Sequence, residues 1–158
     1  MIRLLFAAAL WLAPVSALAH DYKAGGLVIG HPFITATAPN APVAGGYMTI
    51  TNEGADDVLL SASVPVDIAG MVQLHESSMA DGVMRMQPVD GGIPIPSGET
   101  VVLESGGLHL MLMRLPEGLD EGDLVPATLT FRDAGEIHVV FLVEPRGEGA
   151  VDHSDHGS

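Results

Sequence analysis

The sequence contains no cysteine and few basic side chains: 6 lysines and arginines stand against 20 aspartates and glutamates, a formal net charge of -14. The absence of cysteine excludes disulfides, thiolate nucleophiles, iron–sulfur clusters and the His2Cys site of blue-copper electron-transfer proteins. The shortage of basic residues argues against binding to nucleic acid or to an anionic membrane, because both attract clustered lysine and arginine. Cations and basic protein surfaces are therefore the expected partners.

The sequence is comparatively rich in two kinds of metal ligand, with 7 histidines and 8 methionines among 158 residues. Without cysteine, the ligand groups that remain are imidazole, thioether and carboxylate. Thioethers bind Cu(I) well and bind Zn(II), Mg(II) or Ca(II) poorly. The composition therefore favours copper as the bound metal.

Residues 1–19 have the features of a secretory signal peptide. Arg3 is their only charged residue, an apolar run follows from Leu4 to Ala13, and the small-residue sequence Ala17-Leu18-Ala19 is typical of a cleavage site. The apolar run is too short to span a membrane, so no membrane insertion is expected. We predict export, with the bacterial periplasm as the destination.

The rest of the chain reads as one all-β domain. Hydrophobic residues make up 47% of the sequence, enough for a core, and short β-rich runs alternate with turns rich in Gly, Pro, Asn and Asp. This spacing favours a β-sandwich or a small Greek-key barrel over residues 20–145, followed by a flexible acidic tail at 146–158. The predicted strands are Leu27–Ile29, Phe33–Thr37, Gly46–Thr51, Val58–Val64, Met71–Glu76, Met84–Pro88, Thr100–Leu103, His109–Leu115, Ala127–Arg132 and Ile137–Val143.

Four residues are the candidate metal ligands: His75, Met86, His109 and Met111. Residues two apart in a strand share a face, so His109 and Met111 point the same way. His75 and Met86 flank a predicted hairpin with its turn at Met79-Ala80-Asp81-Gly82. Two imidazoles and two thioethers would make a soft, neutral site that holds Cu(I) and can release it. For Met48 and Met71 a place in the hydrophobic core is the simpler interpretation, and for His31 and His138 it is a hydrogen-bonded structural role.

Three segments of the sequence resemble the PCuAC family of periplasmic copper chaperones. They are Gly45-Gly46-Tyr47-Met48-Thr49-Ile50-Thr51-Asn52, the stretch from His75 to Met86, and Gly106-Gly107-Leu108-His109-Leu110-Met111-Leu112-Met113. The family motif is a histidine, ten residues, a methionine, about twenty-one residues and then His-x-Met. Here the two intervals are ten and twenty-two residues. Some members have methionine directly after the first histidine, where this chain has Glu76.

The resemblance implies a cupredoxin-like β-sandwich in which His75, Met86, His109 and Met111 bind Cu(I). It also implies delivery of copper to the dinuclear copper centre of cytochrome c oxidase, alongside an SCO-type partner, with no enzymatic activity of its own. Met84 and Met113 lie two residues from proposed ligands, and their part in copper binding or handover is left open.

Other copper chemistries remain as alternatives. His153 and His156 in the acidic tail form a candidate Cu(II) site, because Cu(II) prefers nitrogen and oxygen ligands. Cleavage after Ala19 would expose His20, whose amine and imidazole could bind Cu(II) in the histidine brace of an oxidative enzyme. The main rival function is copper buffering or resistance, which the same four ligands would serve. An adhesive β-domain without copper affinity is the last alternative.

Overall fold

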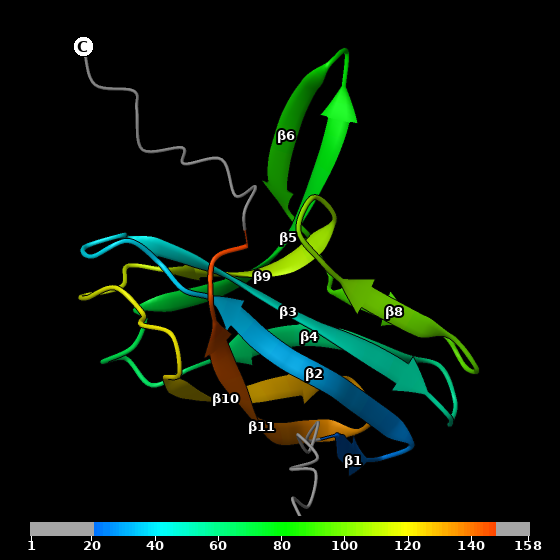
Figure 1. The fold of residues 1–158 in the computed structure, drawn as a ribbon. Helices are drawn as coiled ribbons and strands as arrows, with labels where there is room; N and C mark the ends of the chain where they lie inside the picture. Colours follow the sequence, from blue (N-terminus) through cyan, green and yellow to red (C-terminus); the bar gives the residue numbers. More distant parts are fainter. Residues whose placement is uncertain (1–20, 148–158) are drawn as a thin grey trace, which may run out of the picture.

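The computed structural model describes residues 21–147, which form eleven β-strands and no helix (Figure 1). Within this part of the chain, nothing could cross a bilayer as a helix. The predicted signal peptide and residues 148–158 of the predicted tail lie outside the described residues. The strands are β1 Tyr22–Ala24, β2 Leu27–Thr35, β3 Val43–Asn52, β4 Asp57–Ser63, β5 Met71–Ala80, β6 Val83–Pro88, β7 Ile93–Ile95, β8 Thr100–Leu103, β9 Leu108–Met113, β10 Leu124–Phe131 and β11 Gly135–Glu144.

The strands form one open sheet in the order β6-β5-β9-β3-β2-β11-β10-β4-β7, with β1 beside β2 and β8 beside β3. All pairs are antiparallel except β2 with β11. The sheet folds over, so that β2, β3 and β9 lie across from β4, β10 and β11 (Figure 1). Side chains from both layers, such as Ile50, Leu112 and Phe141, are almost fully buried between them. The predicted all-β, cupredoxin-like architecture is confirmed.

The ten predicted segments correspond to nine of the eleven strands. The first two segments both fall on one strand, β2. A bulge in β2 between Gly30 and Phe33 shifts its register and explains why the sequence pattern breaks there. His31 takes a positive φ of 45° at this bulge. Strands β1 and β7, each of three residues, were missed.

The hairpin of β5 and β6 projects away from the rest of the sheet (Figure 1). The prediction placed its turn over four residues, and this was wrong: Met79 and Ala80 continue β5, and only Asp81 and Gly82 form the turn. Both turn residues have positive φ, 54° and 76°. This is the geometry of a type I′ turn, whose twist matches that of the flanking strands. The turn therefore fixes the register of the hairpin.

Buried Asp57 ties the start of β4 to the turn between β10 and β11. Its carboxylate accepts hydrogen bonds from the backbone N–H groups of Val58 at 2.7 Å, Asp133 at 2.9 Å and Ala134 at 2.9 Å. Burial alone would raise the pKa of Asp57, but these three donors, with Arg132 nearby, outweigh it and lower the pKa. The ionised carboxylate is thus the form that the fold binds.

Replacing Asp57 by alanine is expected to destabilise the protein by about 2–4 kcal/mol, because three backbone donors lose a charged acceptor. Urea unfolding measures the change. Because the folded pKa is lowered, the contribution of Asp57 is complete above its ordinary value of 3.8 and is lost as the pH falls through the folded value. The control is Asp67→Asn, an exposed carboxylate, with an expected change within about 0.5 kcal/mol. Equal effects of the two substitutions would contradict the assigned role.

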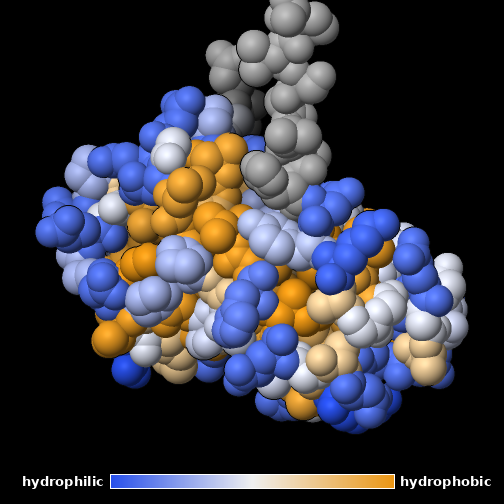
Figure 2. Space-filling model, turned by 90° about the horizontal axis from the view of Figure 1, so that it is seen from below, coloured by the Kyte–Doolittle hydropathy of each residue, from blue (hydrophilic) through white to orange (hydrophobic). Residues whose placement is uncertain are grey.

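Seen from below, the side on which β10 and β11 lie, apolar side chains form a patch between polar ones (Figure 2). Exposed apolar residues of β10 and β11 are Leu124, Val140 and Leu142. The patch therefore belongs to the layer of β4, β10 and β11, which lies opposite the layer that contains β9.

Candidate metal centre

The pairing of β5 with β9 places the two candidate histidines side by side. His75 is the cross-strand partner of His109, and two residues along, Gln73 is the partner of Met111. Directly opposite residues of antiparallel strands point to the same face of the sheet. The two imidazole rings lie with their centroids 5.8 Å apart. Three of the four predicted ligands therefore share one face of two neighbouring strands.

Each imidazole keeps one nitrogen that has no hydrogen-bond partner within residues 21–147. His109 Nδ1 donates to the carbonyl oxygen of Gly107 at 2.9 Å, so its Nε2 carries the lone pair. His75 Nε2 donates to Gln73 Oε1 at 3.0 Å, so its Nδ1 carries the lone pair. Both lone-pair nitrogens are buried and have no partner among the described residues; His75 is 9% exposed and His109 is 4% exposed. Because a buried polar atom without a partner is costly, the pair fits a bound metal ion.

The environment keeps His75 neutral. Burial lowers the pKa of His75 below its ordinary value of 6.5, and repulsion by the neighbouring His109 lowers it further. A neutral imidazole is the form that binds a metal, so at pH 7 no proton has to leave. The folded protein correspondingly loses stability as the pH falls below 6.5 towards the lowered pKa, because the unfolded chain takes up the proton first.

The fourth predicted ligand, Met86, comes from the projecting hairpin. Its cross-strand partner is Ser77, whereas His75 faces Pro88. Met86 is thus the diagonal neighbour of His75, on the same face and at a spacing of about 7–8 Å that a long side chain spans. Met86 is 50% exposed. The arrangement supplies two buried nitrogens from the sheet and an accessible thioether from the hairpin.

Two further residues, Gly45 and Tyr47, shape this site, although no role in it was predicted for them. Tyr47 in β3 lies beside His109, with ring centroids 6.5 Å apart. A Cβ placed on Gly45 would collide with the hydroxyl end of Tyr47, so the phenol ring lies along β3 over this glycine. Gly45 is in turn the cross-strand partner of Met111. Tyr47 therefore forms a wall of the site next to two of the predicted ligands.

The remaining methionines divide between the core and this face. Met48 is 2% exposed, which confirms its prediction as a core residue. Met71 was also predicted to be a core residue, and this was wrong. Its side chain is half-buried, and its cross-strand partner is Met113 in β9. Met71, Gln73 and His75 are each two residues apart along β5, so Met71 lies on the same face as His75.

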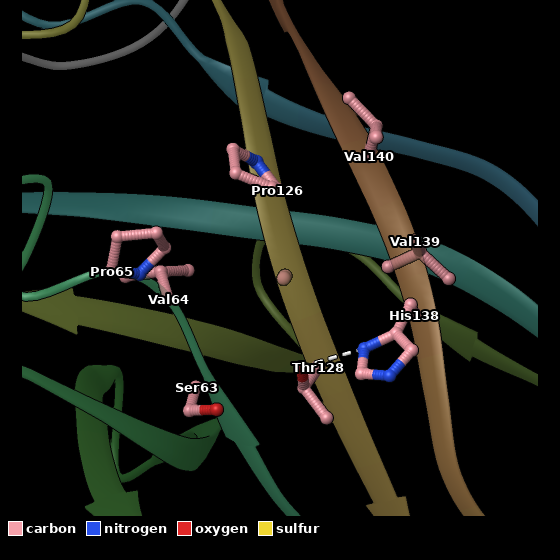
Figure 3. A pocket seen from close by; sticks show the side chains of 9 residues that line it. Ser63, Val64, Pro65, Pro126, Thr128, His138, Val139 and Val140 are labelled. Atoms are coloured by element: carbon pink, nitrogen blue, oxygen red, sulfur yellow. Dashed lines mark hydrogen bonds between the residues drawn. The ribbon is translucent and has the colours of Figure 1, made fainter.

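The other histidines lie apart from the centre. His31 Nε2 is 3.0 Å from the carboxylate of Glu144, and His138 Nδ1 is 3.0 Å from the hydroxyl oxygen of Thr128. His138 also borders an open depression of about 520 Å³ between β4, β10 and β11, lined mainly by valines and prolines (Figure 3). Both histidines have the hydrogen-bonded role that was predicted. The candidate Cu(II) ligands His20, His153 and His156 lie outside the described residues.

A protein family and a curated relative are similar to this chain in sequence. The profile of the family described as "Putative lipoprotein LpqE-like" matches residues 27–143. A curated relative from Leifsonia xyli subsp. xyli, "Putative lipoprotein Lxx21020", is 32% identical over 131 residues, which are 83% of this chain and 77% of the relative.

Solved structures of PCuAC domains are similar to this chain. The copper-bound PCuAC domain from PmoF2 has a TM-score of 0.66 and 26% identity, covering 80% of this chain and 99% of that domain. The solution structure of CuI-DR1885 from Deinococcus radiodurans has a TM-score of 0.56 and 28% identity, covering 81% of this chain and 83% of that protein. The resemblance predicted from the sequence is confirmed.

Proposed function

The chain belongs to the LpqE-like family, and from this premise we propose that it is a periplasmic copper chaperone. In this proposal His75, Met86, His109 and Met111 bind Cu(I), and the protein delivers the ion to the dinuclear copper centre of cytochrome c oxidase. The observation that carries the proposal is the pair of buried lone-pair nitrogens on adjacent strands. Solved relatives described as copper-bound and CuI-bound support copper as the ion.

The proposed ligand set suits an ion that is carried and then released. Two neutral imidazoles and two thioethers select a soft cation, and they hold it less tightly than thiolates would. His75 and His109 are buried, whereas Met86 is half-exposed on the hairpin. A recipient can therefore replace Met86 first and take the ion by successive ligand exchange.

Export and partners complete the proposal. The lipoprotein descriptions of the family and of the Leifsonia relative support a protein of the cell envelope. The resemblance to PCuAC chaperones supports the copper-bearing subunit of cytochrome c oxidase as recipient and an SCO-type protein as co-partner. A net charge of -14 favours rapid encounter with a basic docking surface. The chaperone itself needs no enzymatic activity.

Copper buffering is the second candidate, because the same ligands would store the ion. Deleting the gene distinguishes the two functions. Delivery predicts loss of oxidase activity that added copper restores, whereas buffering predicts copper sensitivity with normal oxidase activity. Transfer of Cu(I) from the loaded protein to an apo oxidase copper domain in vitro is the direct biochemical test, and absence of transfer would count against delivery.

Gln73 is expected to support the metal site without binding the ion. Its side-chain oxygen holds His75 in the tautomer whose Nδ1 is free. Replacing Gln73 by leucine should weaken Cu(I) binding about 10–100-fold, the usual cost of losing such a partner. A Cu(I) titration against a competing chelator measures the change. Gln87→Leu, on an exposed position of β6 on the opposite face, is the matched control, and equal affinities in both variants would contradict the role.

A further inference from the structure

Three methionines lie exposed on one face of the projecting hairpin. Met79 is 65% exposed, Met84 55% and Met86 50%. All six residues of β6 are exposed, and among the described strands β6 pairs with β5 alone. The thioethers of β6 consequently contribute nothing to the hydrophobic core, so their presence needs another explanation.

The turn brings Met79 and Met84 directly opposite each other. Ala80 and Val83 close the two-residue turn, and Met79 and Met84 form the next cross-strand pair. The closing pair of such a turn is hydrogen-bonded, so the next pair is of the non-hydrogen-bonded kind, in which side chains approach most closely. Pro88 also falls on a non-hydrogen-bonded position, which agrees with its lack of an N–H group. The Cβ atoms of Met79 and Met84 are therefore about 4.5–5.5 Å apart.

The two faces of the hairpin differ in chemistry. The face opposite the methionines carries two polar cross-strand pairs, Glu76 with Gln87 and Ser78 with Arg85, and beside the turn the apolar pair Ala80 and Val83. A ribbon exposed on both faces would ordinarily be polar on both. Here sulfur is confined to the face that also carries His75, two positions further along from Ser77. The thioethers thus form a line from the hairpin tip towards the histidines.

We propose that Met79 and Met84 form a second Cu(I) site at the hairpin tip, distinct from the four-ligand site. Two flexible thioethers opposite each other can converge on one soft ion, and Cu(I) accepts low coordination numbers. Met86, two residues from Met84 on the same face, is the third thioether available to this ion when the deeper site is empty. Met86 therefore belongs to both sites and can pass the ion between them. The inference rests on the proposed function, because it takes the deeper site to bind the first ion.

Methionine methyl NMR tests the tip site directly, since Cu(I) is diamagnetic. The protein is labelled with [methyl-13C]methionine and titrated anaerobically with Cu(I). The first equivalent should shift Met86 and Met111, and the second should shift Met79 and Met84. In Met79→Leu/Met84→Leu the first equivalent should bind unchanged and the second should be lost. Leucine keeps the apolar surface and removes only the sulfur. Met71→Leu, at the other end of β5, should retain both equivalents.

The outcomes separate the two proposals. Normal shifts with the first equivalent, but no shift of Met79 and Met84 with the second, would overturn the tip site alone. Retention of the second equivalent by the double leucine variant would do the same and would leave an apolar contact role for these side chains. If the first equivalent failed to shift Met86 and Met111, the four-ligand site would fall, and with it the premise of the tip site.

Discussion

Replacing Met86 and Met111 together by leucine should weaken Cu(I) binding by at least about 100-fold, equivalent to about 2.7 kcal/mol. The two thioethers supply the soft half of the proposed ligand set, and leucine preserves their bulk without a sulfur atom. Cu(II) binding should change far less, because Cu(II) prefers the nitrogens of His75 and His109, which stay in place. Parallel titrations with the two oxidation states measure the contrast.

Met48→Leu is the matched control for this double variant. It removes a thioether from the buried core, and such a conservative exchange of side chains costs little stability. Its Cu(I) affinity should equal that of the parent protein. Tight Cu(I) binding that survives the loss of both Met86 and Met111 would rule out the proposed ligand set.

Replacing His109 by alanine should weaken the binding of both Cu(I) and Cu(II), because imidazole serves either oxidation state. The same variant has a second readout in the metal-free protein. Repulsion by His109 contributes to the lowered pKa of His75, so the pKa of His75 should rise in the variant and stay below 6.5 through burial alone. An NMR titration of the His75 ring measures this shift.

His138→Ala is the control for the loss of an imidazole. His138 lies beside Thr128 on the layer formed by β10 and β11, so its removal should leave both copper affinities unchanged. Far-UV circular dichroism identifies any variant that has lost its β-structure. A folded His109→Ala protein with the copper affinity of the parent would contradict the assignment of His109.

The parts of the site that depend on local sequence could be predicted. His109 and Met111 lie two residues apart in a strand, and the period of two alone places them on one face. The β-rich runs likewise located most of the strands. These features follow from the geometry of a single extended segment.

The parts that depend on pairing between distant segments could not be predicted from the residues alone. The sequence gives no register for β5 against β9, yet this register sets His75 opposite His109. The hydrogen bond of Gln73 to His75 and the position of Tyr47 over Gly45 follow from the same packing. Gly45 was the available signal in the sequence. It indicates a close contact only once the position of the Tyr47 ring is known.

Short elements escaped prediction for a physical reason. Strand β7 has only three residues and contains Pro94, a residue that argues against a strand unless the strand lies at an edge. Strand β7 ends the order of the sheet, so the proline is tolerated there. In the hairpin, the run from Met71 was predicted to end before Met79, because Asp81-Gly82 was taken with its two preceding residues as one longer turn.

X-ray absorption spectroscopy at the copper edge, on protein loaded with one equivalent of Cu(I), identifies the atoms that bind the ion. We expect two nitrogen and two sulfur ligands around each copper ion, from His75, His109, Met86 and Met111. A first shell of nitrogen and oxygen atoms without sulfur would contradict it.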